Sequence, residues 1–132
     1  MSIKRRLHLK VVAAVLALST PLIATHGNAK SFSFRHVEFM SADQREAAAQ
    51  AFVANDLSPG TPLDSALKTL KRANAYCQTP SVASEPISCT HVSFERTPDN
   101  AGIIDVVWTV RVTPAADGTV SNATVTRSRS GF

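Results

Sequence analysis

The chain has 132 residues, room for one domain, and 44% of them are hydrophobic. Its formal net charge is +4, but the excess basic residues lie within residues 1–10, and residues 30–132 carry equal numbers of basic and acidic side chains. The sequence has no basic patch interleaved with aromatic residues, so charge and composition exclude nucleic-acid binding as the leading function.

Residues 1–29 have the layout of a secretory signal peptide. Basic residues precede an apolar run at residues 11–18, and Gly27 and Ala29 stand at the −3 and −1 positions of a cleavage site. We expect cleavage after Ala29, with Ala24 as a second choice. The apolar run is shorter than the roughly 20 residues that a membrane span requires, so the mature chain is expected to have no span.

The leader also bears on the compartment. No lipobox cysteine follows it, so lipid anchoring is not expected, and an Arg-Arg pair leaves twin-arginine export open beside the general route. The expected location is the bacterial periplasm, with release from the cell as the alternative. Residues 30–132 then form a single α+β domain with a polar C-terminal tail.

Residues 30–40 are rich in apolar side chains. Phe32 and Phe34 alternate, as do Val37 and Phe39, which predicts a short strand or an extended arm lying on the domain. Packing into the core is one interpretation of these side chains. The other is an interface made by Phe32, Phe34 and Phe39.

Two helices are expected next. The first spans residues 41–55, with Ser41 as N-cap, Gln44 in a capping box and one face made of Ala48, Ala51 and Phe52.

After a Pro-Gly turn, the second helix has Thr61 as N-cap and Pro62 at the first helical position, and it ends near Asn74. Its apolar face has helical spacing and consists of Leu63, Ala66, Leu67 and Leu70.

Alternating apolar residues predict three strands joined by turns, at residues 87–95, 103–113 and 120–127. The first strand has Thr90, Val92 and Phe94 on one face and Cys89, His91 and Ser93 on the other. The middle strand has a face that we expect to be buried, made of Ile104, Val106, Trp108, Val110 and Val112. Residues 128–132 are expected to be a mostly polar tail.

This order of elements predicts an α+β fold. Two N-terminal helices pack on one face of an antiparallel β-meander of three strands, or of four if residues 30–40 also form a strand.

The only two cysteines, Cys77 and Cys89, follow the leader. An even number of cysteines in an exported chain predicts a disulfide. The spacing is not that of a Cys-x-x-Cys redox motif. A metal site is not expected, because His91 is the one histidine nearby and further ligands are missing.

The segment Gly60-Thr61-Pro62-Leu63-Asp64-Ser65-Ala66-Leu67 resembles the start of the second helix in the SmpA/OmlA (BamE-like) periplasmic proteins. It is also similar to the repeated unit of the secreted beta-lactamase inhibitory proteins. The resemblance covers residues 41–125 and implies a helix pair on an antiparallel sheet. In the inhibitory proteins it also implies a disulfide from the helix end to the next strand, as Cys77 and Cys89 would form.

The chain departs from the SmpA/OmlA pattern at two points. The methionine of the motif is absent, and residues 72–75 replace the Leu-Gly-x-Pro helix ending. We therefore carry over no binding residues.

Motifs of hydrolases, metalloproteases and nucleotide or dinucleotide sites are missing from the sequence. We therefore expect a protein that is not an enzyme and needs no cofactor. The predicted function is a small exported protein-interaction module of the cell envelope, an assembly accessory or an inhibitor-like binder, whose partner is another envelope or secreted protein. The alternative is a small-ligand-binding or hydrolytic domain using His36 and His91.

Overall fold

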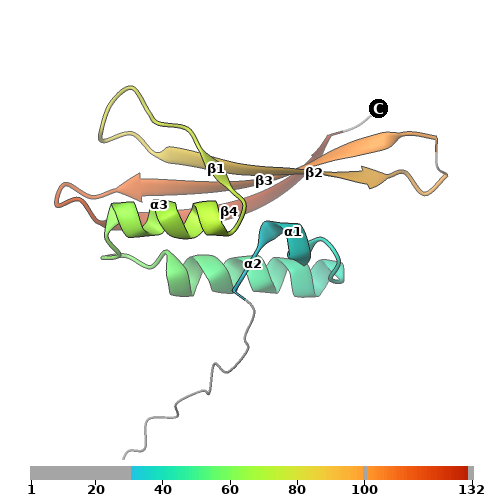
Figure 1. Ribbon diagram of the computed structural model, residues 1–132, viewed down its shortest axis with the longest axis horizontal. Coiled ribbons are helices and arrows are strands. Elements are labelled where there is room, and N and C mark those ends of the chain that lie inside the picture. Colours follow the sequence, from blue (N-terminus) through green and yellow to red (C-terminus); the bar gives the residue numbers. More distant parts are fainter. Residues whose placement is uncertain (1–30, 100, 131–132) are drawn as a thin grey trace, which may run out of the picture.

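The computed structural model describes residues 31–99 and 101–130. The predicted signal peptide and its cleavage site lie outside these residues. The elements follow in the order α1 (Phe34–Val37), α2 (Ala42–Asp56), α3 (Leu63–Arg72), β1 (Tyr76–Cys77), β2 (Ile87–Arg96), β3 (Ile103–Pro114) and β4 (Val120–Ser130). The strands form one antiparallel sheet in the order β1-β2-β3-β4, and the three helices lie on one side of it (Figure 1). The predicted α+β class is confirmed.

The expected strand or arm at residues 30–40 was wrong, because part of this segment forms the helical turn α1. Ser33 caps the turn, its Oγ accepting a hydrogen bond from the Arg35 N–H at 3.2 Å. Phe34 and Val37, three residues apart, are both buried. That spacing is helical, and Phe32 precedes the helix, so the alternation of Phe32 and Phe34 carried no strand signal.

Helix α2 begins as predicted. The Ser41 Oγ accepts a hydrogen bond from the Gln44 N–H at 3.4 Å, which is the N-cap contact. Its buried residues are Ala49, Phe52 and Val53. Ala51 is exposed, so the apolar face is rotated from the predicted one.

Helix α3 begins one residue later than expected, and Thr61 is not its N-cap. Pro62 takes the N-cap place with no side-chain hydrogen bond. Thr61 instead belongs to an extended stretch, since its C=O accepts from the Val120 N–H at 2.8 Å and Gly60 donates to the Val120 C=O at 2.8 Å. The residues before α3 therefore pair with the start of β4.

The end of α3 turns the chain onto the sheet. Asn74 has a φ of 67°, a left-handed conformation that asparagine tolerates better than most residues. The Ala75 N–H donates to the Leu70 C=O at 2.9 Å and Asn74 to the Lys71 C=O at 3.1 Å, the hydrogen bonds of a Schellman motif. The chain leaves this motif directly into β1.

The fourth strand of the sheet is β1, which the sequence did not reveal. Tyr76 pairs with Thr90 and Cys77 with Cys89, so β1 covers only one end of β2. The expected polar tail is also partly strand, because β4 continues to Ser130, opposite Asp105 of β3. A backbone partner is sufficient to extend a strand whose side chains are polar.

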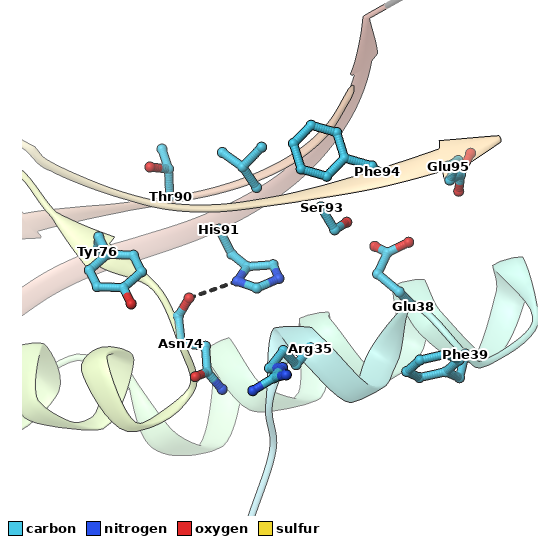
Figure 2. A pocket seen from close by; sticks show the side chains of 11 residues that line it. Arg35, Glu38, Phe39, Asn74, Tyr76, Thr90, His91, Ser93, Phe94 and Glu95 are labelled. Atoms are coloured by element: carbon cyan, nitrogen blue, oxygen red, sulfur yellow. Dashed lines mark hydrogen bonds between the residues drawn. The ribbon is translucent and has the colours of Figure 1, made fainter. Parts of the chain in front are cut away.

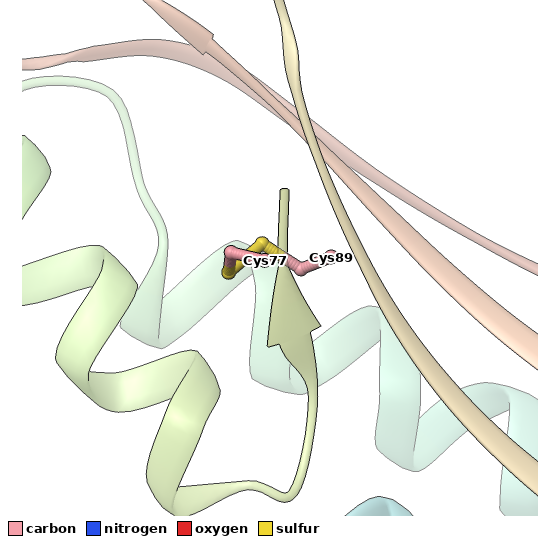
Figure 3. Close-up of a disulfide and its surroundings, with 2 residues drawn as sticks. All are labelled: Cys77 and Cys89. Carbon is pink, nitrogen blue, oxygen red and sulfur yellow. A yellow bond between two sulfur atoms is a disulfide. The ribbon is translucent and has the colours of Figure 1, made fainter. Parts of the chain in front are cut away.

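The core lies between the helices and the inner face of the sheet. Its largest fully buried side chains are Trp108, Phe34, Leu57 and Leu70. The predicted buried row of β3 is confirmed at Val106, Trp108, Val110 and Val112. Cys77 and Cys89 are joined by a disulfide that clamps β1 to β2 (Figure 3).

Candidate functional site

The edge of β2 is open beyond the short strand β1. The Gln78 N–H donates to the Ser88 C=O at 2.9 Å, so even-numbered residues of β2 direct their backbone groups toward the β1 side. Past Thr90 no described residue pairs with β2 on that side. The N–H and C=O groups of Val92 and Phe94 are therefore left without a backbone partner among the described residues.

A cleft of about 670 Å³ lies along this open edge, between β2 and α1 (Figure 2). In the figure, Phe94 and Thr90 lie on the side of β2 away from α1, and His91 and Ser93 on the side toward it. The cleft therefore wraps around the strand edge. Its lining residues are Arg35, Glu38, Phe39, Asn74, Tyr76, Thr90, His91, Val92, Ser93, Phe94 and Glu95.

Contacts with the end of α3 hold α1 at a fixed place beside the cleft. The Phe34 N–H donates to the Ala73 C=O at 3.0 Å. The Asn74 side-chain amide donates to the Ser33 Oγ at 2.7 Å. Because Asn74 also sits where the chain turns into β1, the residue sets the spacing between α1 and the sheet.

His91 lines the cleft on its inner side. It is buried on the inner face of β2, and its ring stacks on Phe34 with centroids 6.1 Å apart. Its Nδ1 lies 2.8 Å from the Asn74 C=O. A carbonyl oxygen can only accept, so Nδ1 donates and carries a proton. The imidazole thus contributes a tie between β2 and the end of α3.

A charged cluster adjoins one end of the cleft, and its two carboxylates, Glu38 and Glu95, line the cleft. We define the charged cluster as Glu38, Arg45, Glu95, Arg127 and Arg129. Glu38 accepts hydrogen bonds from the Trp108 Nε1 and from Arg127, whose Nε and Nη2 lie 3.2 and 2.9 Å from the two carboxylate oxygens. The Glu38, Arg45 and Arg127 side chains are only 13%, 15% and 14% exposed. Glu38 therefore ties α1 to both β3 and β4.

The other members surround this central pair. Arg127 Nη2 also donates to Glu95, and Arg129 Nη2 lies 2.9 Å from the second Glu95 oxygen. Arg45 Nη2 donates to the backbone carbonyls of Glu38 and Met40, at 3.4 and 3.2 Å, at the end of α1. With three guanidinium groups and two carboxylates, the charged cluster has a net positive charge.

These contacts change the titration of two groups. Burial alone would raise the pKa of Glu38, but the hydrogen bonds from Arg127 and Trp108 and the charges of Arg127 and Arg45 outweigh it and lower that pKa. The hydrogen bond to Glu38 raises the pKa of Arg127 against the effect of burial, with further help from Glu95. Both groups therefore stay ionised at neutral pH, which makes Glu38 a poor proton donor.

The outer face of the sheet, which no described helix covers, bears an apolar strip beside the cleft. We define the strip as Tyr76, Val92, Phe94 and Ile103, which are 74%, 51%, 69% and 64% exposed. The register puts Tyr76 opposite Thr90 and Ile103 opposite Arg96, so all four residues lie on the same face. Exposed apolar groups that gather in this way are typical of interaction surfaces.

The phenylalanines proposed as an interface lie in different places. Phe34 is fully buried, and Phe32 is half-buried and stacks on Phe52 with centroids 4.3 Å apart. Phe39 is 90% exposed and lines the cleft. Of the three, Phe39 is the one whose side chain is largely exposed in this structure.

The structure does not bring His36 and His91 to one cleft. His36 is exposed on α1 and lines a separate hollow with Phe32 and Met40. His91 is buried beside the cleft of β2 and is hydrogen-bonded to Asn74. Within residues 31–99 and 101–130, no group of three His, Cys, Asp or Glu side chains gathers as metal ligands would.

Sequence reasoning did not identify the charged cluster or the open edge. Glu38 and Arg127 are 89 residues apart, so no local pattern connects them. The alternation in the sequence correctly placed Val92 and Phe94 on the opposite face of β2 from Cys89 and His91. It did not tell which of these two faces points toward the core.

No helix in the described part of the chain is long and apolar enough to cross a membrane. Searches against family models, curated proteins and solved structures gave no match to this chain. The resemblance of residues 60–67 to the SmpA/OmlA and beta-lactamase inhibitory proteins therefore stays a prediction.

Proposed function

We propose that this chain is a small protein-interaction module of the bacterial cell envelope, exported to the periplasm, that binds another envelope or secreted protein. The apolar strip is the observation that carries the proposal. Tyr76, Val92, Phe94 and Ile103 remain exposed although they lie on the sheet. Exposing apolar surface to water is unfavourable, and a partner that covers this strip would remove that cost.

The chemistry of the cleft supports binding over catalysis. Its carboxylates, Glu38 and Glu95, are neutralised by arginines, and His91 uses Nδ1 to hold Asn74. General acid–base catalysis needs a titratable group close to neutrality and within reach of a substrate. The geometry of His36 and His91 offers no specific support for the alternative, a ligand-binding or hydrolytic domain.

The disulfide supports the proposed compartment. Disulfides persist in oxidising environments such as the periplasm and are rare in the cytosol. The Cys77–Cys89 bond is compatible with export, and the described residues contain no membrane-spanning helix.

Co-purification from an envelope extract tests the proposal when it is paired with two matched variants. Phe94→Glu places a charge in the apolar strip, whereas Thr126→Glu places one on the polar part of the same outer face. We expect the wild type and Thr126→Glu to recover the same protein and Phe94→Glu to lose it, as measured by quantitative mass spectrometry. Recovery of no specific protein, or equal recovery by Phe94→Glu, would contradict the proposal.

A further inference from the structure

We propose that an extended, acidic segment of a partner protein adds to the open edge of β2 as a further strand, paired with residues 92–96. This inference rests on the proposed function and names the mode of binding. The unpaired backbone groups of Val92 and Phe94 point away from β3 and toward the cleft. A row of free N–H and C=O groups at a sheet edge is a template for one more strand.

The cleft has the position that such a strand requires. It continues the line of β1 past Thr90, and it reaches around the edge to both faces of β2. Because side chains alternate along a strand, the added segment would present every second residue to the apolar strip. The residues between them would point toward α1, where Arg35 and Phe39 line the cleft.

Charge selects an acidic occupant. Among the described residues, Arg35 of α1 and Arg96 at the end of β2 form no ion pair. Both are exposed. The carboxylates that line the cleft, Glu38 and Glu95, are paired with arginines of the charged cluster, so the unpaired charge in the cleft lining is the positive charge of Arg35. Complementary charge across an interface favours the matching partner and penalises a partner of like charge.

The same charges disfavour two other occupants. A second copy joined edge to edge through a two-fold axis would bring the same excess of positive charge to both sides of the interface. Residues 1–10 of this chain carry only basic charges, namely Lys4, Arg5, Arg6 and Lys10. An acidic segment of another protein is therefore the occupant that the surface favours.

The opposite edge of the sheet does not offer the same site. The outward-facing residues of β4 are polar, namely Asn122, Thr124, Thr126, Ser128 and Ser130. Arg127 and Arg129 lie on its other face, within the charged cluster. Charged and polar side chains on an edge discourage strand addition.

The proposal can be tested by NMR titration of the exported, disulfide-bonded protein with a short synthetic peptide in which aspartate alternates with valine. We expect shifts of the amide signals of residues 92–96 and slower hydrogen exchange of the Val92 and Phe94 N–H groups. The matched peptide with lysine in place of aspartate should bind at least about tenfold more weakly, since a tenfold change corresponds to one favourable charge contact.

Two charge-reversal variants provide the control. Arg35→Glu should weaken binding of the acidic peptide by at least about tenfold and improve binding of the basic one. Arg111→Glu has the same change of net charge but lies opposite Ser88, at the covered end of β2, and should bind like the wild type. Equal effects of the two variants would overturn the proposal.

Three further results would also overturn it. They are shifts along β4 instead of β2, binding without slower exchange at Val92 and Phe94, and protection of these amides by dimerisation without peptide. If the peptide fails while the envelope partner is still lost in Phe94→Glu, only the strand-addition mode is refuted. If both experiments fail, the proposed function falls with it.

Discussion

The sheet ends in two edges, and the described residues cover one end of each edge and leave its other end open. On β4, the residues before α3 cover the start of the strand, where Val120 bonds to both Gly60 and Thr61. On β2, β1 covers Cys89 and Thr90, and the disulfide holds it there. The open parts differ in chemistry, because β4 is polar along its outer face whereas β2 exposes Val92 and Phe94.

The two open edges therefore differ in how they interact with water and with other strands. A polar edge such as that of β4 remains in water at little cost and resists association with other strands. An apolar edge gains nothing from exposure to water, so the exposed side chains of β2 beside the cleft are the feature on which the proposed binding rests. The covered end of β2 gives that edge a fixed boundary, since β1 and its disulfide limit the open part to residues 91–96.

The largest effect on stability is expected from removing the disulfide that holds β1 on the covered end of β2. Cys77→Ser should lower the free energy of unfolding by about 3 kcal/mol, because the lost cross-link closes a short loop in the unfolded chain. Urea unfolding followed by circular dichroism measures this change, and hydrogen exchange should accelerate at Thr90, the partner of Tyr76.

Cys89→Ser provides the comparison for this variant. It removes the same bond but also places a hydroxyl at a fully buried position, so it should destabilise the protein further than Cys77→Ser. Two free thiols in the native protein, or an unchanged unfolding midpoint in Cys77→Ser, would rule out the disulfide as the clamp of this edge.

A smaller loss of stability is expected when the contacts that hold α1 beside the cleft are weakened. Glu38→Gln removes the carboxylate that links α1 to Trp108 and Arg127, and should cost about 2 kcal/mol at pH 7, as expected for hydrogen bonds to charged groups. The neighbouring arginines lose their central counter-charge at the same time. Denaturant unfolding of both proteins measures the difference.

The pH dependence of this difference has a definite sign. The pKa of Glu38 is lowered in the folded state, so its contribution is complete above the ordinary pKa of glutamate, about 4.3. It is lost as the pH falls through the folded-state pKa. The gap in stability between wild type and Glu38→Gln should therefore be constant from pH 7 to about 5 and shrink below about pH 4.

Two carboxylates outside the charged cluster do not disturb this measurement. The pKa values of Asp99 and Asp117 are also lowered, through hydrogen bonds from Thr97 and Thr119, but both carboxylates are present in the two proteins. A gap that widens as the pH falls below about 5 would mean that the pKa of Glu38 is raised in the folded state, which would contradict its contacts with the arginines.

Much of the fold was predictable from strong local patterns. The Ser41 cap fixed the start of α2, and the alternating apolar row around Trp108 marked the buried face of β3. The failures lie where a distant partner decides the structure. Residues 76–77 form a strand only because Thr90 and Cys89 lie beside them, and Thr61 is drawn into pairing with Val120 before it can cap α3.

The candidate site was less predictable for a related reason. The disulfide was expected from the cysteine count, and Phe39 from its place in an apolar segment. The contact of Glu38 with Arg127 joins α1 to β4, and a charged pair of that kind has no periodic signal in the sequence. The exposure of Phe94 depends on which face of β2 the helices cover, which only the assembled fold determines.

The smallest effect is expected at the open end of β4. Arg129 is half-exposed, and Glu95, at 2.9 Å, is its one ion-pair partner within residues 31–99 and 101–130. Arg129→Gln should therefore change the free energy of unfolding by less than about 0.5 kcal/mol. Arg127→Gln is the matched comparison, because Arg127 lies two residues earlier on the same face of β4. It should cost about 2 kcal/mol, because Arg127 is largely buried and bonded to two carboxylates. Equal losses in the two variants, measured by urea unfolding, would mean that the exposed Arg129 stabilises the fold as much as the largely buried Arg127, which would contradict this ranking.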